Sequence, residues 1–421
     1  MKTFMLGWEF PPFISGGLGT ACYGLTKAMD RLGIQITFVL PKTSDISFGS
    51  HVKMLSTEGH IKTEEVSEFK NVSFRGIAAN LRPYVACGTY EACQKEKKTN
   101  LIRLWHSGRT EQPEHYGWDM YEQVHCYAAK ATDIATVEDF DVIHAHDWMT
   151  YPAGIAVSKI SHKPLLVHVH STEFDRSGEH VNQMIYGVER QGMDTAVKVI
   201  AVSNYTRNII IRRYGIQSEK VEVVYNGVEH NYGVPLHTLP DKTEKIVLFL
   251  GRITMQKGPE YFLAAAKKVL EKIENVKFVM AGDGDMLHRS IELAAQMGIG
   301  HKVLFTRFLR GSDVDRMYQM ADLYVMPSVS EPFGIAPLEA LQHHVPVLIS
   351  KQSGVAETLK HVLKVDFWDI NEMTNKIVAV LKYPALHKTL CNNGHLEAYK
   401  FRWEDAAKRV NKIYEETLAS A

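Results

Sequence analysis

Two glutamates in the last quarter of the chain have the type and spacing of a ligand-binding site at a strand end. In the segment PSVSEPFGIAPLEA, Glu331 follows a short apolar run and Glu339 comes eight residues later. The run LYVMP is predicted to be a strand, so Glu331 would lie at its carboxyl end, where α/β domains bind ligands. Glu339 would lie in the first turns of the next helix, whose N-terminus offers unpaired N–H groups to an anion. The alternative is that Glu331 caps the helix and Glu339 is a solvated helix residue.

Two cations occupy an equivalent loop earlier in the chain. Arg252 and Lys257 lie five residues apart in GRITMQKGPE, which follows the apolar run KIVLFL. The loop ends in Gly258 and Pro259, and proline is favoured at the first position of a helix. Two cations beside a helix N-terminus suit a diphosphate group. The alternative is a pair of solvated loop cations.

Two glycine-bearing loops offer backbone N–H groups to the same kind of ligand. In SKQSGVAE, the small residue Gly354 is expected to open another helix and to allow a phosphate to approach closely. Near the N-terminus, Gly16, Gly17 and Gly19 stand between the apolar run TFMLG and an amphipathic helix pattern. This loop matches neither a P-loop nor a dinucleotide fingerprint.

Histidines alternate on two predicted strands of the first half of the chain. VIHAHDW places His144 and His146 on one face of a strand, and PLLVHVH does the same with His168 and His170. No cysteine or carboxylate cluster joins these pairs at ligand spacing, so no metal site is expected. The segment GDGD, 282–285, is interpreted as a tight turn in which an aspartate caps the next helix, rather than as a metal-binding D-x-D.

The elements that must position these residues alternate between strand and helix. Apolar runs extend from TFMLG to VEVVYNG, the pattern breaks at NYGVPLHTLPDKTE, and it restarts at KIVLFLG. We therefore expect two doubly wound α/β domains that face each other across a cleft and are joined by a linker at 231–244. The first would span 1–235 and the second 236–402. Residues 42–120 are weakly periodic and are interpreted as an elaboration of the first domain.

Local signals predict where several elements begin and end. Gly33 is well placed to end the helix that follows the first glycine loop. Pro41 is expected to stop the strand IQITFVL. Ser203 or Asn204 is expected to cap the helix YTRNIIIRRYG.

Bulk composition narrows the class of protein. The chain has 421 residues, of which 45% are hydrophobic, and its 48 basic residues balance 48 acidic ones. Zero net charge gives no reason to expect nucleic acid, or a membrane held by charge alone, as a partner. Five scattered cysteines without a C-x-x-C indicate reduced thiols. No signal-peptide pattern and no apolar run of ~18 residues is present, so a cytoplasmic protein without stable membrane insertion is expected.

Together the quoted segments resemble the GT-B glycosyltransferases, in particular the retaining family 4 type and its glycogen and starch synthase relatives. The resemblance is carried in the second half by Arg252, Lys257, AGDGDM, PSVSEPFGIAPLEA and SGVAE. In the first half it is carried by PPFISGGLG, VIHAHDW, HVHSTEFDRSG, VSNYTR and VVYNGV. It covers most of the chain apart from about 42–120. It implies two Rossmann-like domains and a C-terminal helix, 403–421, that crosses back to the first domain.

By this resemblance the second domain binds a nucleotide sugar. Arg252 and Lys257 would hold its diphosphate and steady the leaving group, Glu331 would lie beside the transferred sugar, and Glu339 would reach the ribose. The resemblance implies further donor contacts at Gly16, Gly17, Gly19, Gly282, Phe333, Gly334, Ile335 and Gly354.

The first domain would supply the fourth catalytic residue and the acceptor side. The resemblance singles out His170 as the residue near the transferred hexose, and it places Asp147, Trp148 and Asp175 along the cleft. Neither a metal nor another cofactor is expected, because arginine, lysine and helix N-termini would supply the positive charge. The expected stereochemistry is retention by front-face transfer, since no second carboxylate is obviously placed as a nucleophile.

The implied activity is that of a hexosyltransferase. Its donor would be UDP- or ADP-glucose and its acceptor the non-reducing end of an α-1,4-glucan, as in glycogen synthases. The alternative is another family 4 hexosyltransferase that makes a disaccharide or a cell-envelope glycan. One position departs from the glucan synthases, because Ile14 stands where they commonly have lysine. A GT-B-shaped epimerase and a non-catalytic glucan-binding module are disfavoured by the combination of Arg252, Lys257 and Glu331.

Overall fold

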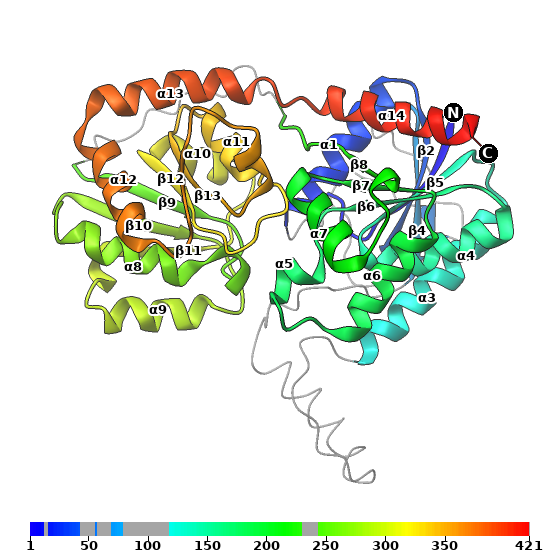
Figure 1. Cartoon of the computed structure of the whole chain (residues 1–421), viewed down its shortest axis with the longest axis horizontal. Coiled ribbons are helices and arrows are strands. Elements are labelled where there is room, and N and C mark those ends of the chain that lie inside the picture. The colour runs from blue at the N-terminus through cyan, green and yellow to red at the C-terminus, as the bar shows by residue number, and fades with distance from the viewer. Residues whose placement is uncertain (12–15, 43–54, 57–68, 79–117, 230–242, 421) are drawn as a thin grey trace, which may run out of the picture.

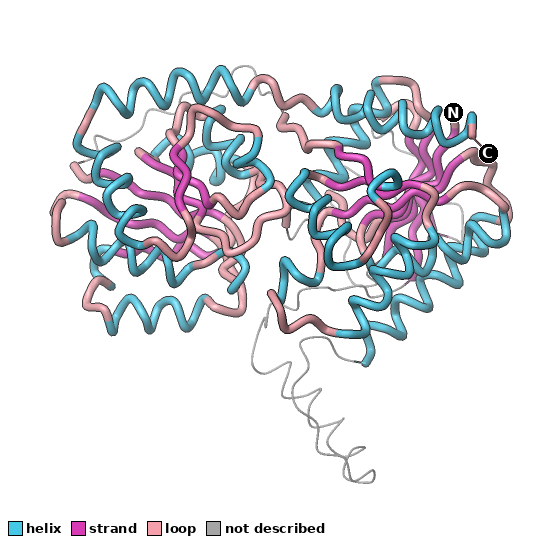
Figure 2. Tube along the Cα trace, in the orientation of Figure 1, coloured by secondary structure: helices cyan, strands magenta, loops and turns pink. Residues whose placement is uncertain are grey.

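The computed structural model contains two α/β domains, each built on one parallel sheet with helices on its faces (Figures 1 and 2). We call the part built on strands β1–β8 the first domain and the part built on β9–β14 the second domain. The structure describes residues 1–11, 16–42, 55–56, 69–78, 118–229 and 243–420.

The first domain has an eight-stranded sheet in the order β3-β4-β2-β1-β5-β6-β7-β8. Its strands are β1 (Lys2–Leu6), β2 (Gln35–Lys42), β3 (Leu55–Ser56), β4 (Val72–Ala78), β5 (Val142–His146), β6 (Leu165–Val169), β7 (Lys198–Ala201) and β8 (Val221–Val223). Its helices are α1 (Gly17–Arg31), α3 (Trp118–Ala135), α4 (Tyr151–Ser161), α5 (Glu173–Ser177), α6 (Gln183–Thr195) and α7 (Asn204–Tyr214). Strands β3 and β4 fall within 42–120, so the described part of that region extends the first sheet.

The second domain has a six-stranded sheet in the order β11-β10-β9-β12-β13-β14. Its strands are β9 (Lys245–Leu250), β10 (Val276–Ala281), β11 (Val303–Arg307), β12 (Leu323–Met326), β13 (Val347–Ser350) and β14 (Leu363–Val365). Its helices are α8 (Pro259–Leu270), α9 (Leu287–Gln296), α10 (Ser312–Met320), α11 (Ala336–Gln342), α12 (Ile370–Lys382) and α13 (Pro384–Ala398). This strand order is that of a Rossmann domain.

In both sheets the chain order reverses near the middle, between β1 and β5 in the first and between β9 and β12 in the second. At such a reversal the loops that follow the two strands diverge, and a crevice opens at their carboxyl ends. The loops after β1, β5, β9 and β12 carry many of the predicted site residues, and His170, Gly282 and Gly354 follow β6, β10 and β13. The fold therefore brings together segments that are up to about 300 residues apart in the sequence.

Helix α14 (Trp403–Ala419) follows the second domain and packs on α1 of the first (Figure 1). The two chain segments that cross between the domains pair with each other, because Val228 and Arg402 form a parallel bridge. At Gly24 of α1 a side chain would lie 2.2 Å from the Trp403 ring, so glycine is required for this contact. Arg31 also pairs with Glu404 at 2.8 Å. The expected return of the last helix to the first domain is confirmed.

Several local predictions are confirmed. Helix α8 has Pro259 at its first position. Ser203, and not Asn204, caps α7, because its side chain accepts a hydrogen bond from the backbone of Thr206. Gly33 follows the end of α1 with a φ of 77°, a conformation that favours glycine.

Three local predictions are wrong. Strand β2 continues through Pro41 to Lys42, because its register with β1 ends at Val39 and the proline nitrogen is not needed there as a donor. Helix α9 begins only at Leu287 and has no side-chain cap, so the aspartates of GDGD do not cap it. The residues after Ser353 form a four-residue 3-10 turn, η5 (Gly354–Glu357), instead of a new α-helix.

The predicted linker at 231–244 falls almost entirely outside the described residues, and so does Ile14. Within the described ranges, no helix combines the length and the apolar character that crossing a membrane requires.

Candidate active site between the two domains

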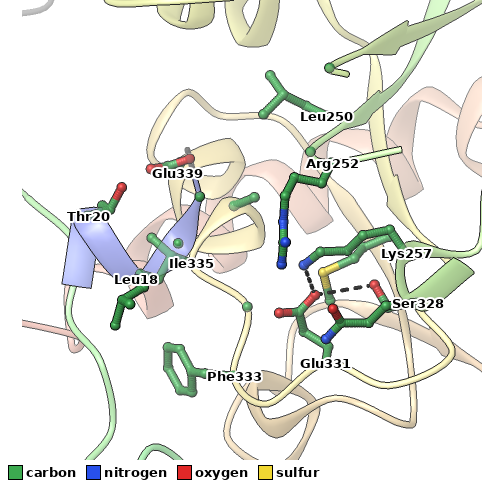
Figure 3. A pocket seen from close by; sticks show the side chains of 18 of the residues that line it. Leu18, Thr20, Leu250, Arg252, Lys257, Ser328, Glu331, Phe333, Ile335 and Glu339 are labelled. Atoms are coloured by element: carbon green, nitrogen blue, oxygen red, sulfur yellow. Dashed lines mark hydrogen bonds and ion pairs between the residues drawn. The ribbon is translucent and has the colours of Figure 1, made fainter. Parts of the chain in front are cut away.

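A cavity of about 540 Å³ lies between the domains at the carboxyl ends of both sheets. Figure 3 shows the loop after β12, the Arg252 loop and the start of α1 meeting around it. The predicted residues that line it are Gly16, Gly17, Asp147, His170, Arg252, Lys257, Gly282, Glu331, Phe333, Gly334, Ile335 and Glu339. The structure therefore gathers most of the predicted donor and catalytic residues in one place.

Glu331 lies on the loop after β12 and is held from two sides. Its carboxylate forms an ion pair with Nζ of Lys257 and accepts a 3.3 Å hydrogen bond from Oγ of Ser328 (Figure 3). Its backbone nitrogen donates to Gln352 and its carbonyl accepts from Gly354, both at 2.9 Å. The residue is only 7% exposed, so its carboxylate is largely shielded from solvent, and charges in such surroundings act strongly on a ligand.

The loop after β9 carries both cations. Lys257 ends the 3-10 turn η3 (Met255–Lys257), and Gly258 follows with a φ of 69°. A Cβ on Gly258 would lie 2.2 Å from the carbonyl oxygen of Pro327, so only glycine allows this loop to pack on the Glu331 loop. A Cβ on Gly16 would lie 3.6 Å from Nε of Arg252. The first-domain glycine loop and the second-domain cations thus lie side by side.

Glu339 lies on α11 and reaches the cavity from the other side of the Glu331 loop (Figure 3). The hydroxyl of Tyr318 donates to its carboxylate at 3.0 Å. Burial raises the pKa of the Glu339 carboxyl, and the Tyr318 hydrogen bond opposes this shift. Its acceptor oxygens suit hydroxyl groups of a ligand, such as those of a ribose.

Asp147 and His170 form part of the first-domain wall of the cavity. Asp147 follows β5 with φ 59° and ψ 169°, a region that residues other than glycine rarely occupy. Its Oδ1 accepts hydrogen bonds from the backbone nitrogens of His170 at 2.7 Å and Ser171 at 3.3 Å. Burial raises the pKa of the Asp147 carboxyl to about 7. Burial also holds the pKa of His170 well below its usual range. Asp147 therefore positions the loop that carries a neutral His170.

Four predicted site residues lie outside the cavity lining. The backbone nitrogen of Gly19 donates to Glu9 at 2.9 Å, and Trp148 is 3% exposed in the first-domain core. Asp175 is 2% exposed and accepts a hydrogen bond from Ser330 of the second domain. Gly354 packs against Ser203 and Pro332, where a side chain would not fit. These residues support the cavity from behind in this structure.

Several lining residues were missed by the sequence interpretation: Glu9, Asn226, Ser328, Phe308 and Arg310. Phe308 and Arg310 lie in the loop after β11, and the same strand-end rule that selected Arg252 would have selected them. Asn226 stands in the quoted VVYNGV. No local pattern in the sequence indicates that its side chain lines the cavity.

Comparison with known proteins shows the family of the chain. Residues 237–397 match the model for glycosyl transferases group 1, and residues 84–232 match that for glycosyltransferase family 4. The chain is a family 4 glycosyltransferase with the GT-B fold.

Relatives of this glycosyltransferase carry several different names. It is 29% identical to an uncharacterized glycosyltransferase of Methanocaldococcus jannaschii, over 98% of each chain. It is 23% identical to a glycogen synthase of Mycobacterium tuberculosis, over 85% of this chain and 80% of the relative. It is 25% identical to an Escherichia coli α-1,3-galactosyltransferase that acts on a diphosphoundecaprenol-linked sugar, over 66% of this chain and 74% of the relative.

Solved structures share the fold of this glycosyltransferase at low identity. A sucrose-phosphate synthase from Thermosynechococcus elongatus has a TM-score of 0.73 at 19% identity, over the whole of both chains. HepE from Anabaena, in complex with UDP-glucose, has a TM-score of 0.68 at 20% identity, again over the whole of both chains.

Proposed function

We propose that this glycosyltransferase moves a hexose from a nucleotide sugar to a hydroxyl acceptor with retention at the anomeric carbon and without a metal ion. The observation that carries the proposal is the arrangement of Arg252, Lys257 and Glu331 in one cavity opposite Asp147 and His170. Two cations beside a buried carboxylate suit a leaving diphosphate next to a sugar that develops positive charge.

The donor would lie mainly on the second domain. Its diphosphate would be bound by Arg252 and Lys257, and Lys257 would then share its charge between the phosphate and Glu331. The ribose would meet Glu339, and the glycine loop at Gly16 and Gly17 would bring backbone N–H groups toward the phosphates or the sugar. The donor we propose first is UDP-glucose, with ADP-glucose as the alternative. A structural relative in complex with UDP-glucose supports this choice.

Transfer would break the bond between the anomeric carbon and the diphosphate oxygen and form a bond from the acceptor oxygen to the same face of that carbon. The acceptor hydroxyl proton would pass to the departing phosphate oxygen. Glu331 would stabilise the oxocarbenium-like charge, and His170 would hold a hydroxyl of the hexose as a hydrogen-bonding partner. Oδ1 of Asp147 already accepts hydrogen bonds from two backbone nitrogens, and burial raises the pKa of this carboxyl to about 7, so both effects make Asp147 a poorer nucleophile. This supports front-face transfer without a covalent intermediate.

The acceptor we propose is the non-reducing end of an α-1,4-glucan. The glycogen synthase relative supports it, because that match covers 85% of this chain. The second candidate is a hexosyltransferase for a cell-envelope glycan, and the galactosyltransferase relative favours it.

The test is a matrix of UDP-, ADP- and GDP-sugars against glycogen, maltooligosaccharides and lipid-linked sugar acceptors, with product stereochemistry determined by NMR. We expect UDP- or ADP-glucose to elongate the glucan with an α-linkage, and EDTA to leave the rate unchanged. Donor binding without growth of any α-glucan would overturn the glucan acceptor, while a β-linked product or a strict metal requirement would overturn the mechanism.

A further inference from the structure

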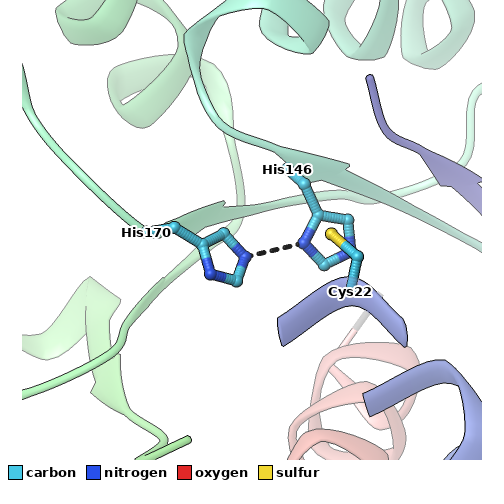
Figure 4. A group of neighbouring side chains, drawn as sticks. All are labelled: Cys22, His146 and His170. Carbon is cyan, nitrogen blue, oxygen red and sulfur yellow. Dashed lines mark hydrogen bonds between the residues drawn. The ribbon is translucent and has the colours of Figure 1, made fainter. Parts of the chain in front are cut away.

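The first domain holds a buried stack of four histidines, of which the proposed transfer reaction uses one. Ring centroids of His144 and His146 are 4.3 Å apart, and those of His168 and His170 are 4.2 Å apart. Cys22 of α1 lies beside two of these histidines, His146 and His170 (Figure 4). One possible ligand atom from each of Cys22, His146 and His170 lies within 4.8 Å of the others. Three metal-binding side chains therefore converge at the inner wall of the cavity.

The stack contains imidazole nitrogens without hydrogen bonds. His146 Nδ1 and His170 Nε2 are 2.9 Å apart and share one proton between them. In the part of the chain that the structure describes, His146 Nε2, His170 Nδ1 and His168 Nε2 are buried and have no partner. An unpaired buried polar group costs about 1–3 kcal/mol, so several at one place need an explanation. When His146 donates to His170, its Nε2 has a free lone pair that a metal ion can accept.

The chemistry of these side chains suits a metal ion. Neutral imidazole and thiolate are the forms that coordinate metals, so a bound cation would displace the thiol proton of Cys22. Cys22 and His146 are fully buried, so few water molecules compete with them for the ion.

We propose that Cys22, His146 and His170 form a binding site for a thiophilic transition-metal ion of the Zn²⁺ type. One sulfur and two imidazole nitrogens favour such an ion over Mg²⁺ or Ca²⁺, which prefer oxygen. The ion enters from the cavity, because His170 lines it. Binding breaks the hydrogen bond between His146 and His170, which frees the His170 lone pair that this bond had occupied. One bond to sulfur and two to nitrogen then form, each imidazole keeps its single proton, and the thiol proton leaves to solvent. A water molecule completes the four ligands that zinc prefers.

A metal ion at this site inhibits the transfer reaction, and this consequence rests on the proposed function. His170 cannot coordinate the ion and also position the hexose. The ion is therefore an inhibitor of an enzyme that needs no metal, and EDTA restores the activity that Zn²⁺ removes.

The site itself is tested by titrating the full chain with Co²⁺ and recording thiolate-to-cobalt charge-transfer absorption. We expect one equivalent to produce this band, and Cys22→Ala to lose it. Cys391→Ala is the matched control, because Cys391 is also a buried thiol beside a histidine, with its Sγ 3.4 Å from His387 Nδ1. Absence of the band in the unaltered protein, or its persistence in Cys22→Ala, would overturn the site.

A second measurement covers the case in which Cys22→Ala does not fold. Zn²⁺ is expected to slow alkylation of Cys22 by iodoacetamide in the unaltered protein at least ten-fold, as read by mass spectrometry, and to leave Cys391 unaffected. Equal alkylation rates with and without Zn²⁺ would contradict the proposal.

The activity arm separates the two proposals. Zn²⁺ should reduce transfer in the unaltered protein at least ten-fold and should have less effect on Cys22→Ala, each measured against its own metal-free rate. Equal inhibition of both proteins would remove Cys22 from the inhibitory site. Cobalt binding in a protein that transfers no sugar would overturn the proposed function and leave the metal site intact.

Discussion

Oγ of Ser330 donates a 2.5 Å hydrogen bond to Oδ1 of Asp175, so a side chain next to Glu331 is tied directly to the first domain. Tyr205 of α7 adds a 3.0 Å contact to the same hydroxyl. Nearby, the carboxylate of Glu357 accepts from the backbone nitrogens of Asn204 and Tyr205 at the start of α7. The loop that carries Glu331 is thereby held in place by both domains.

Ser330→Ala should lower kcat about five-fold, because a net hydrogen bond contributes about 1 kcal/mol and the Glu331 loop would lose one anchor. Donor affinity, measured by calorimetry, should change less than kcat. The control is Ser218→Ala, an exposed serine that hydrogen-bonds Glu219 within the first domain. Unchanged kcat in Ser330→Ala would show that this contact does not position the loop.

Glu331→Gln should reduce turnover by about 10²–10³-fold, the usual effect of removing one group that stabilises transition-state charge. Affinity for the donor should stay within several-fold, since the diphosphate contacts remain. Glu339→Gln is the comparison, because Glu339 is proposed to contact the ribose and its loss should act mainly on donor affinity. Steady-state kinetics and calorimetry together check both variants. Normal turnover in Glu331→Gln would exclude that residue from the chemistry.

Lys257→Ala should weaken binding of UDP or the preferred nucleoside diphosphate about ten-fold, because a charge-assisted hydrogen bond contributes about 1.5–3 kcal/mol. The loss of the lysine also leaves Glu331 without its ion-pair partner. Lys267→Ala, an exposed lysine on α8, should bind the nucleotide normally. If calorimetry finds equal affinity for the two variants, the diphosphate lies elsewhere.

Asp147 allows a test that separates backbone strain from hydrogen bonding. Both Asp147→Ala and Asp147→Gly remove the acceptor for the His170 backbone nitrogen, so both should lose activity. Only glycine adopts φ 59° and ψ 169° without strain. For other residues the strain energy of this conformation is about 1–3 kcal/mol. The melting temperature of Asp147→Gly should therefore exceed that of Asp147→Ala. The reverse order would show that the backbone is not strained in solution.

The buried histidines predict a loss of stability in mild acid. Burial lowers the pKa of His144, His146, His168 and His170 in the folded state, whereas an unfolded histidine titrates near 6.5. Their contribution is complete above pH 6.5 and falls as the pH drops toward the folded pKa values, by up to about 1.4 kcal/mol per pH unit for each histidine. Asp147, whose folded pKa is raised to about 7, changes in the opposite sense and offsets part of this loss. Burial also raises the folded pKa of Asp175, Glu189 and Glu339, which act in the same sense as Asp147. Urea unfolding at pH 7.5, 6.5 and 5.5 measures this, and equal free energies of unfolding would contradict it.

Much of the fold and of the cavity was predictable because local signals and topology agreed. Arg252, Lys257, Glu331 and Glu339 follow strands, and strands of a doubly wound sheet deliver their following loops to one edge. The two sheets were predicted from the alternation of strand and helix patterns along the sequence. The return of the last helix to the first domain was predicted from the family resemblance.

The rest depended on contacts that have no local pattern. Asp175 was expected along the cleft, but its position is decided by Ser330, which lies 155 residues later. Gly19 resembles its neighbours in the glycine loop, yet its backbone nitrogen is taken by Glu9. Pro41 does not end β2 because the neighbouring strand β1 ends first. Strand ends can be found from composition, but which partner each side chain meets is determined by three-dimensional packing.

The return of α14 to α1 has a consequence for synthesis on the ribosome. Met29 and Ala28 of α1 belong to the same buried cluster as Ala407 and Val410 of α14, and the hydroxyl of Tyr414 bonds to Nδ1 of His144 on β5. The whole second domain is translated between these two helices. The first domain therefore emerges from the ribosome with one apolar face uncovered. Helix α14 can cover that face only after the second domain has left the exit tunnel.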